Sequence, residues 1–230
     1  MHTMNTAGIF CLCCLLTILW SAEVDGAEIY VSPSGTGTGL VPTDPIDLQG
    51  ALDLAKDNGD DNTLRLQQGL YRGNFTYDPG SGSNTLAIRG GWNADFTRSS
   101  LNPVDTILDG DSDGDGQGDG TVLKINDWFT SSASGDVEIE GITIRNGDNT
   151  RVGGGIYVLT RPPGTISLNH IIIENNQADS VGGGCALASL DRPPTRGGVH
   201  SRQAKEIAVQ LYEILQYVTR VCRSRPAPAS

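Results

Sequence analysis

Two stretches of the chain, GDVEIEGITIRNGDNTRVGGGIYV at 135–158 and GTISLNHIIIENNQADSVGGGCAL at 164–187, are copies of one pattern. At an offset of 29 residues they are identical at eight of 24 positions, among them the glycines at 153–155 and 182–184. Self-similarity at a period of this size is the sequence signature of a solenoid, in which each repeat packs only on its neighbours.

Within each copy the apolar residues alternate as in a β-strand, and the alternation changes phase once. Val137 and Ile139 share one face, whereas Ile142 and Ile144 follow with the opposite parity. Because side chains in a strand alternate with a period of two, the phase change indicates a corner at which the apolar side stays inward. A third apolar run, 156–159, follows the glycines. The pattern predicts an all-β fold, a parallel β-helix with three short strands per turn; a β-sandwich with glycine-rich turns is the alternative.

Stacking of the two copies leads to further expectations. Asn146 should lie beneath Asn175 at a turn, where the amides can form a ladder. Cys185 takes the place of Ile156, an inward position, so a buried thiol is expected. The glycines should take positive φ or let adjacent coils approach closely, which a residue without Cβ does at little cost. Replacing Gly154 by valine should therefore cost about 1–3 kcal/mol.

Composition and charge restrict the possible partners. The chain has 230 residues with 30 glycines and 11 prolines, a turn-rich composition that suits a solenoid. Residues 1–190 carry 9 Lys and Arg against 24 Asp and Glu, a charge of −15, whereas residues 191–230 carry 7 against 3, a charge of +4. The acidic body argues against nucleic acid and anionic membrane surfaces as partners. Cys185 and Cys222, the two cysteines beyond residue 26, are no disulfide framework.

Residues 7–20 form an uncharged apolar run that is followed by small and polar residues. This length is short for a bilayer span and suits the core of a secretory signal, so residues 1–26 are interpreted as a signal peptide. No Lys or Arg precedes the run, and the alternative is an apolar N-terminal helix that stays attached. A secreted or cell-envelope protein without a membrane span after signal removal is expected.

The β-helix domain is expected over residues 27–190 and to begin with a cap. After a strand at 28–32, Pro45 suits the first position of a helix. This helix would cover the lower end of the solenoid with one apolar stripe, formed by Leu48, Ala51, Leu52 and Ala55. Further strands are predicted at 63–67, 71–77, 85–89 and 106–108.

Several motifs in this order carry a family resemblance: IYVSPSGTGTG (29–39), DLQGALDLAKDNG (47–59), LRLQQGLYRGNF (64–75), LAIRGGWNADFT (86–97), DTILDGD (105–111) and GITIRNG (141–147) before GGGIYV (153–158). The chain resembles secreted right-handed parallel β-helix proteins of the pectate-lyase-type superfold, and its repeats are similar to those of polymorphic outer membrane proteins. The resemblance implies a right-handed coil. It does not select an activity, because such coils serve enzymes, adhesins and passive surface proteins alike.

Two functions are therefore expected as alternatives. The first is an exported adhesive or structural scaffold without catalytic residues, with glycans or cell-surface components as partners. The second is the N-terminal fragment of a polysaccharide lyase or glycoside hydrolase. Glu138 and Glu140 share the outer face about 7 Å apart, a separation that suits an inverting acid–base pair. In the next copy Ser167 and Asn169 take the places of these two glutamates, so the acids do not continue along the solenoid. No cluster of acids with a basic residue across several coils is therefore expected. A carboxylate and arginine cluster across three coils would favour the enzyme.

The stretch DGDSDGDGQGDG at 109–120 is the chemically most distinctive one. Alternate carboxylates separated by small residues can curl around one hard cation, and the spacing follows a calcium loop with Gly116 at the tight turn. Val122 stands where that loop has a bidentate glutamate. We expect a structural Ca²⁺ site, with a solvated acidic turn as the alternative. The expected ligands are Asp109, Asp111, Asp113, Asp115 and Asp119.

Residues 191–230 differ from the rest in composition. A linker rich in proline and glycine precedes a segment, 201–222, in which apolar residues recur at spacings of three and four, the pattern of an amphipathic helix. These residues are Ala204, Ile207, Leu211, Ile214, Val218 and Val221. The regular stripe favours a real C-terminal helix, while the sudden change in charge and the loss of the repeat favour a truncation or frameshift artefact.

Overall fold

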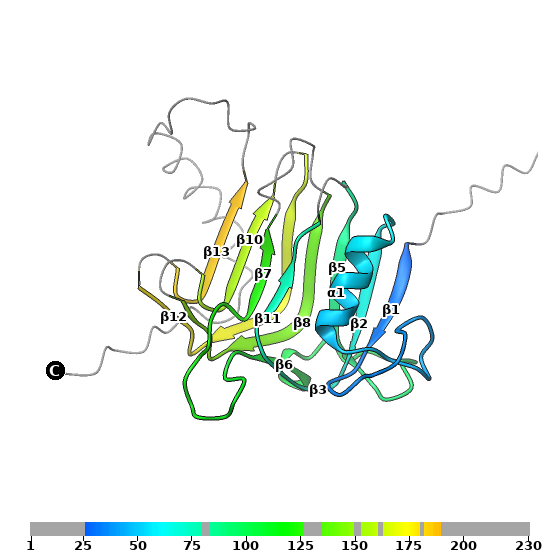
Figure 1. Ribbon diagram of the computed structural model, residues 1–230, viewed down its shortest axis with the longest axis horizontal. Coiled ribbons are helices and arrows are strands. Elements are labelled where there is room, and N and C mark those ends of the chain that lie inside the picture. The colour runs from blue at the N-terminus through cyan, green and yellow to red at the C-terminus, as the bar shows by residue number, and fades with distance from the viewer. Residues whose placement is uncertain are drawn as a thin grey trace, which may run out of the picture.

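The computed structural model describes residues 26–79, 83–126, 135–149, 153–160, 163–179 and 182–189, and it shows a mostly parallel β-solenoid of about four turns (Figure 1). The predicted signal peptide and C-terminal segment lie outside the described residues. Three faces surround one core. The first face contains β1 (Ala27–Val31), β2 (Asn62–Gln67), β5 (Leu86–Trp92) and the first halves of β8 (Val137–Arg145) and β11 (Ile166–Glu174).

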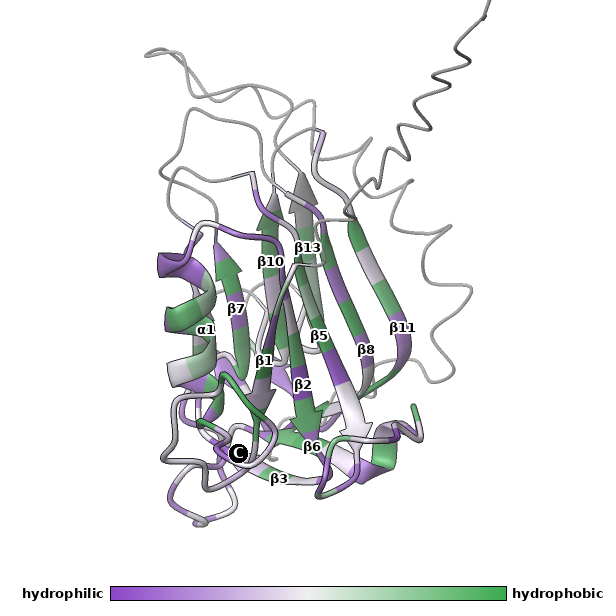
Figure 2. Ribbon diagram, turned by 90° about the vertical axis from the view of Figure 1, so that its right-hand side faces the viewer, coloured by the Kyte–Doolittle hydropathy of each residue, from purple (hydrophilic) through white to green (hydrophobic). Residues whose placement is uncertain are grey.

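The second face contains β3 (Gly69–Arg72), β6 (Thr106–Asp109) and the second halves of β8 and β11. The third face contains β4 (Phe75–Tyr77), β7 (Leu123–Asn126), β10 (Ile156–Thr160) and β13 (Cys185–Ser189). A short pair, β9 (Asp148–Asn149) and β12 (Gln177–Ala178), lies in the turns, and the 3-10 helix η1 (Pro103–Asp105) precedes β6. Hydrophobic and hydrophilic residues alternate along the strands of the first face (Figure 2), as inward and outward positions require.

The register confirms the internal repeat. Val137 pairs with Ile166 in the parallel ladder of β8 and β11, and β10 pairs with β13 at the same offset. The predicted corner is also present, because the backbone turns at Gly141 with φ 68° and at His170 with φ 51°. Since both corners take the left-handed conformation, His170 accepts a strained backbone where the first copy has glycine.

Two expectations need correction, one about a strand and one about the amide that joins the turns. The run expected at 71–77 is divided into β3 and β4, because Gly73, with φ 133°, turns the chain onto the third face. The amide that joins the stacked coils belongs to Asn176: its Oδ1 accepts from the Gly147 N–H at 2.8 Å, and its Nδ2 donates to the Ile144 carbonyl at 3.0 Å. Asn146 donates its amide to Asp109 instead.

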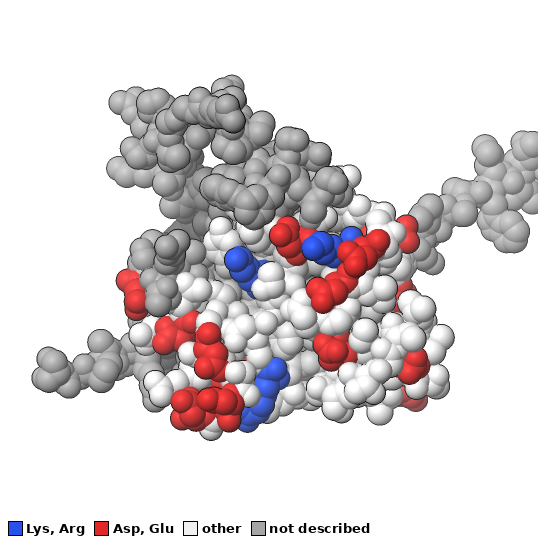
Figure 3. Space-filling model, viewed as in Figure 1, with Lys and Arg blue, Asp and Glu red and all other residues white. Residues whose placement is uncertain are grey.

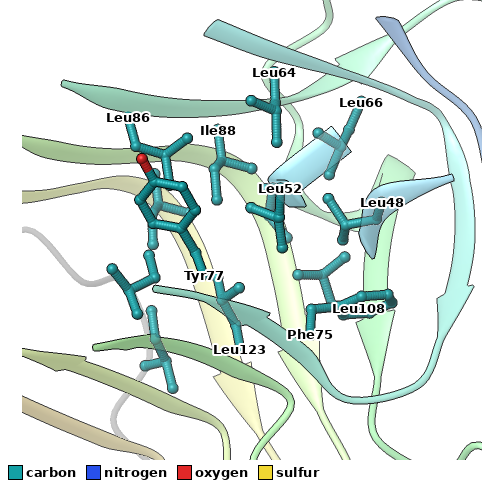
Figure 4. Packing of buried hydrophobic residues seen from close by; sticks show 14 of the residues in the cluster. Leu48, Leu52, Leu64, Leu66, Phe75, Tyr77, Leu86, Ile88, Leu108 and Leu123 are labelled. Carbon is teal, nitrogen blue, oxygen red and sulfur yellow. The ribbon is translucent and has the colours of Figure 1, made fainter. Parts of the chain in front are cut away.

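The helix α1 (Leu48–Asp57) lies over the N-terminal end of the solenoid, as predicted. It begins three residues after Pro45, since Asp47 is the N-cap and accepts from the Gly50 N–H at 2.9 Å. The four stripe residues are all buried. Figure 4 shows Leu48 and Leu52 among the core side chains contributed by β2 and β4.

α1 also closes an open strand edge. The side-chain amide of Gln49 bonds both backbone groups of Thr76 in β4, donating to its carbonyl at 3.0 Å and accepting from its N–H at 2.9 Å. This pair of bonds replaces a neighbouring strand. The edge of β1 is covered in a similar way, because the Ile46 N–H donates to the Tyr30 carbonyl and the Ile46 carbonyl accepts from Ser32, each at 3.0 Å. Covered edges do not recruit other chains.

Candidate metal loop and charged outer face

The acidic loop connects β6 to β7, and Figure 3 shows acidic side chains gathered at this edge of the molecule. The structure brings together three of the five predicted ligands: one carboxylate oxygen from each of Asp111, Asp113 and Asp115 lies within 4.8 Å of the others. Asp111 holds the loop in shape, since its carboxylate accepts from the N–H groups of Gly114 at 2.8 Å and Gly116 at 3.1 Å.

The other two predicted ligands have protein partners. Asp109 is 2% exposed, and one of its oxygens accepts from Nε of Arg145 at 2.9 Å while the other accepts from Nδ2 of Asn146 at 2.9 Å. Asp119 accepts from the backbone N–H of Ser112 at 3.0 Å and from the hydroxyl of the same residue. Val122, at the position of the missing glutamate, is fully buried in the core.

The donor set of the loop suits a hard cation. Three carboxylates provide oxygen ligands of the kind that Ca²⁺ prefers, and Asp113 and Asp115 are exposed, so water can complete a shell of six to eight oxygens. Arg72 lies beside this group, with Nη1 3.9 Å from Oδ2 of Asp111, and relieves part of the repulsion among the carboxylates.

Asp109 has an electrostatic role within the fold. Burial by itself raises the pKa of this carboxyl, but the hydrogen bonds from Asn146, the Asp111 N–H and Arg145, with the charge of Arg145, outweigh burial and lower the pKa. A carboxyl whose pKa is lower in the folded state stabilises the fold above its unfolded pKa of about 3.9, and this contribution is lost as the pH falls through the folded pKa.

Asp109→Asn is expected to lower the free energy of unfolding by about 2 kcal/mol at pH 7, because it removes one partner of a buried ion pair. The difference from the wild type should shrink as the pH falls below about 4, because the carboxyl is then protonated first in the unfolded chain and, below its lowered folded pKa, in the folded protein as well. Urea unfolding at both pH values measures this effect. Asp57→Asn, at an exposed position, is the control and should change stability by less than about 0.5 kcal/mol. An undiminished difference at low pH would contradict the assignment.

A second group of charged residues lies on the outer side of the first face. The strand registers align one outward residue from each strand in a single row that runs along the solenoid. The row consists of Tyr30, Arg65, Arg89, Glu140 and Asn169. Two glutamates lie on one side of this row, each two residues before it in its strand: Arg65 pairs with Glu28, and Nη2 of Arg89 lies 3.5 Å from Oε2 of Glu138.

Aromatic rings surround the first arginine of the row. The guanidinium carbon of Arg65 lies 4.4 Å from the ring centroid of Trp92 and 5.7 Å from that of Tyr30. Burial, and next the charge of Arg89, lower the pKa of Arg65. Nε of Arg65 and Nε1 of Trp92 are buried donors without an acceptor among the described residues. The face therefore brings guanidinium groups, carboxylates and aromatic rings close together.

The expectation that no acid and arginine cluster spans several coils is wrong in this respect. Arg65, Arg89 and Glu140 come from three successive coils, and His170 lies 3.5 Å from Glu140. Both arginines precede the internal repeat, so the repeat alone does not predict that they lie beside the glutamates. Arg65 in LRLQ and Arg89 in AIRG each occupy an outward position of a strand. The alternation of apolar and polar residues in these two segments predicts that both arginines point outward.

No protein-family model, curated protein or solved structure matches the chain. The class of the protein, a parallel β-solenoid, is therefore defined by its own fold. Within the described residues, no helix has both the length and the apolar character required to cross a membrane.

Proposed function

We propose that the protein is an exported scaffold of the cell surface or extracellular space, a right-handed β-helix of the pectate-lyase-type superfold that is adhesive or structural and has no catalytic role. The handedness follows from the right-handed sense that connections between parallel strands of one sheet take. The proposal of export is supported by the apolar run at residues 7–20. Glycans or cell-surface components are the proposed partners.

The row of charged and aromatic side chains on the first face carries this proposal. Sugar hydroxyls can donate to carboxylates such as Glu138 and accept from guanidinium groups, and sugar rings pack on aromatic side chains. Parallel strands repeat this arrangement at about 4.8 Å along a rigid axis, which suits an extended chain of similar units. The acidic body repels dense polyanions, so nucleic acid is not a proposed partner.

Binding to an immobilised glycan panel tests the proposed function. The wild type should bind one class of glycan, and Arg89→Gln should weaken this binding about tenfold, as expected for the loss of a charge-assisted hydrogen bond. Lys124→Gln makes the same change of charge on the third face, where Lys124 is exposed, and is the matched control. Equal loss in both variants, or no binding by the wild type, would reject the adhesive function.

The second candidate, a fragment of a polysaccharide lyase or glycoside hydrolase, is favoured by the cluster of Arg65, Arg89, Glu138 and Glu140 across neighbouring coils. Against it, Glu138 is paired with Arg89 and Glu140 lies against His170, as in a ladder of surface ion pairs. A turnover assay on pectin and other uronate polymers distinguishes the two. Cleavage above the blank that Glu138→Gln or Glu140→Gln abolishes would replace the scaffold by the enzyme.

We also propose that the acidic loop binds Ca²⁺ weakly and that the ion has a structural role. Because the clustered ligands belong to the folded state, calcium should raise the melting temperature, by about 3–6 °C at ten times the dissociation constant. Thermal melts in millimolar calcium and in chelator measure the shift. It should vanish in Asp113→Ala/Asp115→Ala and persist in the control Asp57→Ala/Asp60→Ala, which removes two exposed carboxylates elsewhere. A shift that survives the first pair would place the ion at another site.

A further inference from the structure

The two ends of the described solenoid differ in how they are covered. At the N-terminal end, α1 and the bonds from Gln49 and Ile46 close the first coil. At the other end, within the described ranges up to residue 189, β11 hydrogen-bonds only to β8 and β13 only to β10. The outer edges of β11 and β13 therefore have no strand partner among the described residues.

Burial of the inward residues confirms this asymmetry. Ile139, Ile142 and Ile144 of β8 are each 0% exposed, whereas the residues stacked on them in β11, Leu168, Ile171 and Ile173, are 7%, 4% and 3% exposed. Ile166, Cys185 and Leu187 belong to the same coil and are only partly buried, although they pack against the core. This coil has apolar side chains that a covering element would bury.

The amphipathic segment 201–222 has the properties that this end requires. Its stripe from Ala204 to Val221 would extend over about 27 Å as a helix, compared with about 15 Å for the ten residues of α1. The linker of residues 190–200 can reach about 35 Å when extended, enough to return the segment to the last coil. The tail is basic and the body is acidic, so long-range electrostatics favour contact between them.

We propose that residues 201–222 pack their apolar stripe on the coil formed by β11, β12 and β13 and close the C-terminal end of the solenoid, as α1 closes the N-terminal end. This inference rests on the helix that the sequence predicts for residues 201–222, and it makes the tail part of the fold. It is independent of glycan binding, which concerns the first face.

Amide hydrogen exchange on the full chain tests the proposal. Leu211→Asp places a charge in the middle of the stripe, and it should speed exchange in β11 and β13 about tenfold relative to the amides of β2, which serve as the internal reference. Gln216→Asp lies on the opposite side of the helix and should leave the ratio unchanged. Ile207→Asn, a milder change in the stripe, should give a smaller increase.

Three results would overturn the cap. Unprotected amides over 201–222 in the wild type would show that the proposed helix itself does not form. Protected amides there, with no effect of Leu211→Asp on β11 and β13, would mean that the helix forms and packs elsewhere. Protection of the last coil that depends on protein concentration, with dimers in analytical sedimentation, would assign the end to a second copy of the chain. None of these results bears on glycan binding.

Discussion

Replacing Gly154 by valine is expected to lower the free energy of unfolding by about 3 kcal/mol or more, at the upper end of the cost of overpacking. The physical reason is space between coils. A Cβ at Gly154 would overlap the carbonyl oxygen of Gln177 in the next coil and would lie 2.8 Å from that of Gly183. Both obstacles are backbone atoms in stacked turns, so neither can move without separating the coils.

The structure also shows which of the two expected reasons applies to each glycine. Gly153 and Gly182 take the left-handed conformation, with φ of 62° and 68°, whereas Gly154 is required for the close approach alone. Gly59→Ala is the matched control, because Gly59 has φ 73° and open space around its Cα, so that variant carries only the conformational cost of about 1 kcal/mol. In thermal melts Gly154→Val should lose about 6–12 °C. A loss no larger than that of Gly59→Ala would contradict the packing argument.

Leu52→Ala is expected to destabilise the protein by about 3 kcal/mol, because it removes a fully buried side chain and leaves a cavity that the surrounding strands cannot fill. Figure 4 shows Leu52 beside Leu48 of the same helix, with Leu64 and Leu66 of β2 next to both. The loss should appear first as faster hydrogen exchange in β1 and β2, since α1 is the cap of that end.

Lys56→Ala is the control for the helix itself. Lys56 is exposed, and alanine favours helix, so this variant should change the free energy of unfolding by less than about 0.5 kcal/mol. Urea unfolding of both variants measures the difference. If Leu52→Ala were as mild as Lys56→Ala, α1 would not be part of the cooperative fold.

Much of the candidate metal loop could be predicted, and the reason is local. The alternation of aspartate and glycine at 109–120 places Asp111, Asp113 and Asp115 close together whatever lies around them. The role of Asp109 could not be predicted in this way. Its partners Arg145 and Asn146 are more than thirty residues away, and only the stacking of β6 on β8 brings them to it.

The outer face shows the same division. Period-two alternation is sufficient to infer that Arg65 in β2 and Arg89 in β5 point outward. The residues beside these arginines could not be inferred from the sequence, because a contact between coils depends on which residue of the next coil has the same register. The turns between these strands differ in length, so the sequence does not reveal the register of β2, β5 and β8.

The sequence alone determined the architecture: the period of 29 residues, the corner within each copy, the glycines of the turns and the apolar stripe of α1 all follow from local pattern. These features depend on backbone conformation and on the alternation of inward and outward side chains, which act within a few residues. Only the tertiary structure decided the partners of Asp109, the bridge formed by Asn176 and the row along the first face. Each of these needs atoms from different coils at hydrogen-bond or ion-pair distance, and the stacking of complete turns sets that distance.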